Sequence, residues 1–169
     1  GRGEPVNSVT HILGGLALTS LLCLHTEILD PMEVGAAAMG VIGSLLPDID
    51  HPKSKISNTT LTTKLASFAI SSTTRHRGFC HSLTFIAIVA STLCGLVVPH
   101  VDFLTDGYVM WLSAGMFSHL LLDSLNPTGI KWLWPLGKYR HFAKIKTGST
   151  GEFLVGAMLI VVNIYTFLN

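Results

Sequence analysis

Pro47-Asp48-Ile49-Asp50-His51 ends a short apolar run and places three potential metal ligands within four residues. Histidine and carboxylate form the ligand set of many zinc, manganese and iron sites. Asp48 and Asp50 alternate around Ile49, so both side chains face the same way if this segment is extended. Pro47 disfavours continuation of the preceding helix, which makes a polar turn at a helix end the structural alternative.

Two further apolar runs carry similar groups at one end. The first is opened by Arg75-His76-Arg77-Gly78-Phe79-Cys80-His81-Ser82, and the second is closed by Ser118-His119-Leu120-Leu121-Leu122-Asp123. His119 and Asp123 are four residues apart, so on a helix both point toward the same neighbour. Gly78 allows a turn that leaves His76 in a loop and His81 in the first turn of a helix. Ion pairs between helix ends are the structural alternative, but charges beside lipid-like sequence are costly and favour a functional site.

The composition is that of a membrane protein rather than a soluble one. Of the 169 residues, 49% are hydrophobic and 12% are charged, with a mean hydropathy of +0.52. A soluble domain has about 25% charged residues. The net charge of +1 gives no reason to expect a nucleic-acid partner. We therefore expect one membrane-embedded domain over residues 1–169, in which the polar residues 1–7 lack a signal-peptide core and fit a vector-derived extension.

Five apolar runs predict membrane-spanning helices, although the second is short against the roughly 20 residues that a span needs. These runs are residues 11–29, 31–46, 82–98, 108–125 and 151–168. Between residues 57 and 74, Leu61, Leu65 and Phe68 share one helical face, which predicts either a short interfacial helix or a helix packed over the end of the bundle. The expected fold is an all-α polytopic membrane bundle of about five spans.

The distribution of Lys and Arg predicts the orientation of these spans. Residues 47–82 and 126–150 each hold five of the 11 Lys and Arg, and the connections near Asp30 and Asp102 hold none. By the positive-inside rule, the amino terminus and both long loops face the cytoplasm. All nine candidate metal ligands then lie at the cytoplasmic ends of the spans: His11, Asp48, Asp50, His51, His76, His81, His119, Asp123 and Glu152.

This convergence predicts more ligands than the four that one structural zinc takes, and hence two divalent ions. Zinc is the first choice, with manganese or iron as alternatives. Two ions about 3.5–4 Å apart activate water for hydrolysis, with Asp50 or His76 as the catalytic acid or base. The expected substrate is a phosphoester of a membrane lipid or a lipid-linked molecule, because the site lies at the interface and cationic side chains suit phosphate. The cationic residues expected at the substrate are Lys53, Arg75, Arg77 and Arg140. The positive-inside rule also explains why these residues lie in the two long loops.

Several motifs follow one another in a recognisable order. These are Pro47-Asp48-Ile49-Asp50-His51-Pro52, the two motifs that end in Ser82 and Asp123, then Asn126-Pro127 and Trp134-Pro135. The combination resembles the YdjM-type membrane-bound metal-dependent hydrolases, a family of bacterial inner-membrane proteins whose name is linked to the LexA-controlled damage response. The resemblance implies a multi-span helical protein of the inner membrane and a hydrolase activity at the His and Asp residues of these motifs. A distant likeness to zinc-dependent phospholipases concerns the fold alone.

Two other functions would use the same ligands. In a metal-ion transporter they would form the transport site, but such sites usually lie near the bilayer midplane between repeated halves. The present ligands gather at one membrane face, and the sequence has no internal repeat. In a structural membrane protein, a metal ion would only pin helix ends together. Metal flux in liposomes, turnover of added esters, and metal-dependent melting without turnover distinguish the three functions.

Overall fold

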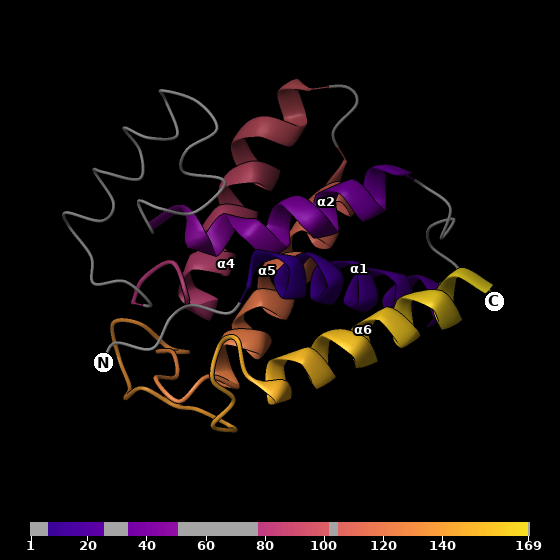
Figure 1. Ribbon diagram of the computed structural model, residues 1–169. Helices are drawn as coiled ribbons and strands as arrows, with labels where there is room; N and C mark the ends of the chain where they lie inside the picture. The colour runs from indigo at the N-terminus through magenta and orange to yellow at the C-terminus, as the bar shows by residue number, and fades with distance from the viewer. Residues whose placement is uncertain (1–6, 26–33, 51–77, 102–104, 169) are drawn as a thin grey trace.

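The computed structural model describes residues 7–25, 34–50, 78–101 and 105–168, and its regular elements are helices (Figure 1). The α-helices are α1 (Ser8–His25), α2 (Val34–Leu45), α4 (Leu83–Thr92), α5 (Asp106–Ser124) and α6 (Thr150–Leu168). The 3-10 helix η1 (Leu46–Asp50) extends α2, while the π-helix η3 (Leu93–Val97) and the 3-10 turn η4 (Val98–His100) extend α4. The all-α prediction is confirmed for these residues.

A helix forms in each of the five predicted runs, but the predicted number of membrane spans is not established. Leu83–His100 and Thr150–Leu168 are long and apolar enough to cross a bilayer, whereas Ser8–Leu24 and Gly35–Ile49 are shorter apolar helices. Helix α5 has 19 residues but carries His119 and Asp123 among them. The interfacial helix expected between residues 57 and 74 lies outside the described residues.

The bundle is built around α5, which packs against α1 and α2, and α6 covers the other side of α1 (Figure 1). Two hydrogen bonds show that α1 and α6 run in the same direction. The Asn7 amide N–H donates to Glu152 Oε1 at 2.7 Å, and Asn163 Nδ2 donates to the Leu13 carbonyl at 3.1 Å. The parallel course of α1 and α6 is the one expected for the first and fifth of five alternating spans.

The outer helices present apolar side chains away from the bundle. Helix α4 has no buried residue, and α6 buries only Glu152 and Thr166. Exposed side chains on α6 include Phe153, Leu154 and Val161, each more than 60% exposed. An apolar surface of this extent is costly in water and suits contact with lipid.

Helices α2 and α5 approach so closely that their backbones touch. A Cβ atom added at Gly43 would lie 2.0 Å from the Leu112 carbonyl oxygen, and one added at Gly115 would lie 2.1 Å from the Gly40 carbonyl oxygen. Small residues are what allow transmembrane helices to pack at this distance. The close contact brings the end of α2 beside the last turns of α5.

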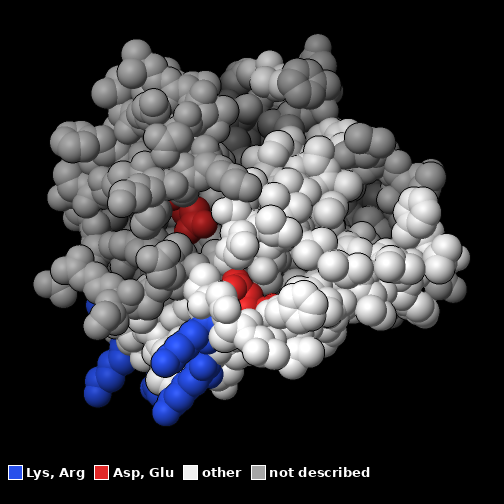
Figure 2. All heavy atoms as spheres, viewed as in Figure 1, with Lys and Arg blue, Asp and Glu red and all other residues white. Residues whose placement is uncertain are grey.

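The segment 126–149 holds the end of α5 and the start of α4. Phe142 N–H donates to the Ser124 carbonyl at 2.7 Å and Ile145 N–H to the Leu125 carbonyl at 2.9 Å, so two helix-end carbonyls are satisfied. The Trp132 carbonyl accepts from Leu83 N–H at 2.9 Å, at the first residue of α4. Within the described residues this segment also holds all the cationic side chains, which Figure 2 shows gathered at one end of the visible face. They are Lys131, Lys138, Arg140, Lys144 and Lys146.

Candidate metal centre

Five of the predicted ligands meet inside the bundle. They are His11 in α1, Asp48 in η1, His81 just before α4, and His119 and Asp123 in the last turns of α5. The three imidazoles are fully buried, and the carboxylates of Asp48 and Asp123 are nearly so. Four separate segments of the chain therefore converge on one buried polar cluster, as the alternating direction of the runs predicts.

The polar atoms of this cluster face one another at short range. His81 Nε2 lies 3.3 Å from Asp123 Oδ2 and 3.6 Å from Asp48 Oδ1. His119 Nε2 lies 3.2 Å from His81 Nε2, and 3.7 and 3.8 Å from the same two carboxylate oxygens. His11 Nε2 lies 3.6 Å from Asp123 Oδ1. The side chains thus surround a common centre from several directions.

The orientation of His119 is fixed by the end of α2. Its Nδ1 lies 2.7 Å from the carbonyl oxygen of Ser44, which can only accept, so Nδ1 carries the proton and donates. Ser44 is in the last turn of α2, where carbonyls lack a partner within the helix. In the neutral ring, the lone pair on Nε2 then points into the cluster. A hydrogen bond of this kind orients a metal-binding imidazole and sets its tautomer.

His11 completes the cluster from the opposite side of His119. The two rings are stacked, with centroids 3.8 Å apart and planes 12° apart. Among the residues that the structure describes, neither nitrogen of the buried His11 ring has a hydrogen-bond partner. A buried polar atom without a partner costs about 1–3 kcal/mol. Coordination of a cation by one of these nitrogens would remove part of that cost, so His11 fits a ligand role.

The spacing of the five side chains also fits a metal site. In a tetrahedral zinc site, nitrogen and oxygen ligands at about 2.0–2.2 Å from the ion are about 3.3–3.6 Å apart. Direct N–H···O hydrogen bonds are shorter, at about 2.7–3.2 Å. The nitrogen-to-oxygen separations in the cluster are 3.3–3.8 Å. These nitrogen-to-oxygen separations match ligands arranged around an ion, while the 3.2 Å contact of His119 with His81 is within hydrogen-bond range.

Two groups of three ligands can be drawn from the cluster, and they share one residue. The first is His11, His119 and Asp123, and the second is Asp48, His81 and His119. Since the Nε2 atom of His119 has one lone pair, it can bind one ion only. Asp123 has two oxygens, and these face different histidines: Oδ1 faces His11 and Oδ2 faces His81. If two ions were bound, Asp123 could therefore offer one oxygen to each of them.

The five residues of the cluster lie in a part of the chain that matches the model of a known protein family. The family model described as "YdjM inner membrane protein" matches residues 6–168. This chain belongs to the YdjM family. The predicted family is thereby confirmed, and the matched range of this YdjM-family protein contains all five residues of the cluster.

Individual relatives support the assignment. The protein is 36% identical to YvsG of Bacillus subtilis over 94% of its own length and 92% of the relative. It is 38% identical to the inner membrane protein YdjM of Escherichia coli over 56% of its length, which covers 46% of that relative. It is 34% identical to the inner membrane protein YbcI of Escherichia coli over 72% of its length and 64% of the relative. No solved structure matches this chain.

Glu152 lies at the same end of the bundle but not in the cluster. Its Oε1 accepts from Asn7 N–H and its Oε2 accepts from Gly148 N–H, both at 2.7 Å. These two hydrogen bonds give Glu152 a structural role, and its role as a metal ligand stays a prediction. Glu152 ties the beginning of α6 to the beginning of α1, because a carboxylate is favoured where backbone N–H groups of helix starts point outward.

The local conformation after α2 also differs from the prediction. Leu46–Asp50 is a 3-10 helix rather than an extended segment. The extended backbone on which the alignment of Asp48 with Asp50 depended is therefore not formed, and the side chain of Asp50 lies outside the described residues. The 3-10 helix continues directly from α2 despite Pro47, because the fixed φ of proline is compatible with helical backbone and its missing N–H costs one hydrogen bond there.

The other predicted site residues divide into two groups. Arg140 is exposed, and its backbone pairs with that of Ile130 through two hydrogen bonds of 2.9 and 3.0 Å. The remaining ones lie outside the described residues, as does the side chain of Asp50: Lys53, His51, Arg75, His76 and Arg77. The predictions for these residues stay predictions.

The sequence reasoning missed one functional group, the backbone carbonyl of Ser44. Its signal was present, because Ser44 lies within the last turn before Pro47 and such carbonyls need an external donor. What the sequence did not show is which helix supplies that donor. The donor comes from α5, because the glycines at the contact let α5 approach α2 closely.

Proposed function

We propose that this YdjM-family protein is a membrane-bound metal-dependent hydrolase whose metal centre is the cluster of His11, Asp48, His81, His119 and Asp123. The observation that carries the proposal is the meeting of these five buried side chains at ligand-to-ligand spacing. A divalent cation would add positive charge beside the two buried carboxylates, which stabilises their ionised form. The proposed cofactor is two divalent ions, with zinc preferred because imidazole and carboxylate are its usual ligands.

His119 and Asp123 have defined tasks in this proposal. His119, held by the Ser44 carbonyl, presents Nε2 as a ligand. Asp123 offers one oxygen to the side of His11 and the other to the side of His81. A bound divalent ion at such a centre lowers the pKa of water and polarises the bond to be cleaved. Asp50 and His76 are proposed to move the proton, as the sequence suggests.

The proposed substrate is a phosphoester carried by a membrane lipid or a lipid-linked molecule. Support comes from charge, since the described cationic side chains all lie in the segment that caps the α5 end bearing Asp123. Arg140 is the proposed anion contact among them. Support for a lipid comes from the apolar outer faces of α4 and α6. By the positive-inside rule, we place this end at the cytoplasmic face of a bacterial inner membrane.

A matched pair of carboxylates on α5 tests the proposal. Asp123→Asn removes a charge from the buried cluster, whereas Asp106→Asn removes one from the exposed start of the same helix. Detergent-purified protein loaded with zinc or manganese is assayed with bis(p-nitrophenyl) phosphate and with phospholipid vesicles. We expect turnover in the wild type and in Asp106→Asn, and none in Asp123→Asn. Metal flux into liposomes without turnover would instead support a transporter.

A further inference from the structure

A groove of about 420 Å³ runs between α1 and α6. Its volume lies within the roughly 300–1,000 Å³ range of sites for small molecules. Most of its wall is apolar, and the apolar residues come from both helices: Val9, Leu13, Phe153, Ala157 and Ile160. Gly156 also lines it, and a Cβ atom added there would meet nothing within 4 Å. The groove is therefore open space rather than a tightly packed helix contact.

The polarity of the groove changes along its length. Asn7, Ser149 and Glu152 line the end at which α1 and α6 both begin, and Leu13 and Ile160 line the part further along both helices. The polar end also carries the segment 126–149, which precedes α6 and holds the described Lys and Arg residues. An amphiphilic molecule would match this gradient if its apolar tail lay along the two helices.

The position of the groove beside the apolar face of α6 indicates which kind of molecule could bind in it. Helix α6 is apolar and long enough to cross a bilayer, and its Phe153 and Ile160 side chains are 74% and 47% exposed beside the groove. Inside a bilayer, such a surface is in contact with hydrocarbon chains rather than water. An acyl chain can therefore enter the groove from the side without leaving the membrane.

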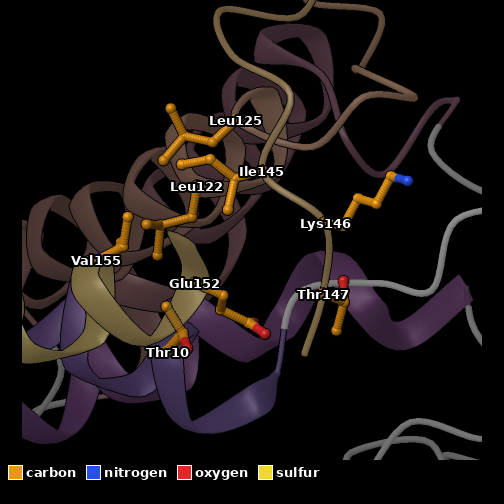
Figure 3. A pocket seen from close by; sticks show the side chains of 8 residues that line it. All are labelled: Thr10, Leu122, Leu125, Ile145, Lys146, Thr147, Glu152 and Val155. Carbon is orange, nitrogen blue, oxygen red and sulfur yellow. The ribbon is translucent and has the colours of Figure 1, made fainter. Parts of the chain in front are cut away.

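The polar end of the groove and the metal centre share the first turns of α1. Thr10 lines the groove and is followed directly by His11 in the cluster. Thr10 and Glu152 also line a second, much smaller cavity of about 10 Å³, which reaches Leu122 next to Asp123. Figure 3 shows Thr10 and Glu152 together on one side of this cavity and Leu122 and Leu125 on the other, with the Lys146 ammonium directed away.

We propose that the groove between α1 and α6 binds one acyl chain of the phospholipid on which the metal centre acts, with the head group at the Asn7 and Glu152 end. This inference rests on the proposed hydrolase function for the role of the lipid as substrate. The binding site itself rests on the groove, its polarity and its position against the bilayer. Thr10 and His11 are consecutive in α1, so the groove and the cluster lie on neighbouring sides of the same helical turn.

Photolabelling in vesicles tests the site. Wild-type protein is reconstituted in phosphatidylethanolamine and phosphatidylglycerol vesicles that contain phosphatidylglycerol with a diazirine on its acyl chain. Labelled peptides are mapped after irradiation. Gly156→Trp fills the groove, and Leu154→Trp is its control, because Leu154 is 63% exposed on the same helix and does not line the groove. Ala157→Leu, a smaller change in the groove wall, serves as a second filling variant.

We expect labels in the wild type to concentrate on Leu13 and Ile160, to fall several-fold in both filling variants and to persist in Leu154→Trp. Uniform labelling of the exposed face of α6 would overturn the proposal, as would crosslinks between two copies of the protein through this groove. Asp123→Asn separates the two claims, since it should keep the labelling while losing turnover. Groove labelling in a wild type without phospholipase turnover would overturn the hydrolase function alone. Turnover without groove labelling would overturn the acyl-chain site alone.

Discussion

Replacement of Gly43 by alanine should weaken metal binding although Gly43 does not touch the cluster. The added Cβ would lie 2.0 Å from the Leu112 carbonyl oxygen, and ordinary contacts begin at 3.4 Å. The backbone atoms on either side cannot rotate away, so α2 and α5 must separate by up to the difference of about 1.4 Å. Overpacking of this kind costs about 1–3 kcal/mol of stability.

The same displacement acts on the metal centre. Ser44, which holds His119, and Asp48, a predicted ligand, both follow Gly43 on the α2 side, whereas His119 and Asp123 are on α5. Metal–ligand distances tolerate changes of about 0.2 Å, several-fold less than the expected shift. Loss of a supporting contact to a ligand typically lowers metal affinity about 10–100-fold. We expect a decrease in this range for Gly43→Ala.

Competition with a fluorescent zinc chelator measures the affinity, and melting in detergent with and without zinc measures the stability. Gly95→Ala is the control, because a Cβ atom at Gly95 meets nothing within 4 Å and the substitution is again glycine to alanine in an apolar helix. The reasoning is refuted if Gly43→Ala melts at a lower temperature yet binds zinc as tightly as Gly95→Ala. That result would mean that the position of α2 does not set the geometry of the site.

Three further predictions concern ligands, substrate and orientation. His81→Ala should release metal from the protein, whereas His100→Ala, at an exposed position in η4, should leave metal content unchanged; inductively coupled plasma mass spectrometry compares the two. Arg140→Ala should retain metal but raise KM for an anionic phosphoester, and an unchanged KM would remove Arg140 from the substrate site. Reporters fused after Lys138 and at Asp102 should report cytoplasm and exterior, respectively; a cytoplasmic signal from both would contradict the alternating spans.

The convergence of the metal ligands could be predicted from the sequence because it follows from chain direction alone. His11 is near the start of its run, Asp48 follows the end of the next, and His81 precedes the start of another, so alternating runs bring them to one end. The same reasoning placed Glu152 at this end correctly. It could not show that the Glu152 carboxylate is used by the N–H groups of Asn7 and Gly148, since that depends on the loop before α6.

The details of packing could not be predicted from the sequence. Gly43 and Gly115 are two of 16 glycines, and only the helix pairing reveals that each lies against a backbone carbonyl. The extended conformation predicted after α2 was wrong for a related reason. A proline ends an α-helix but is compatible with the 3-10 helix of Leu46–Asp50. The number of membrane spans stays a prediction, since α5 owes its burial to the bundle and two of the described helices meet the length and composition of a span.

The metal content of the purified protein tests the central claim most directly. The protein is extracted in detergent without chelator, exchanged into metal-free buffer, and analysed by inductively coupled plasma mass spectrometry alongside an Asp123→Asn sample prepared in parallel. The account predicts between one and two divalent ions per wild-type chain and a several-fold lower content in the folded variant. A wild-type content far below one ion per chain, unchanged after incubation with zinc, manganese or iron, would contradict it.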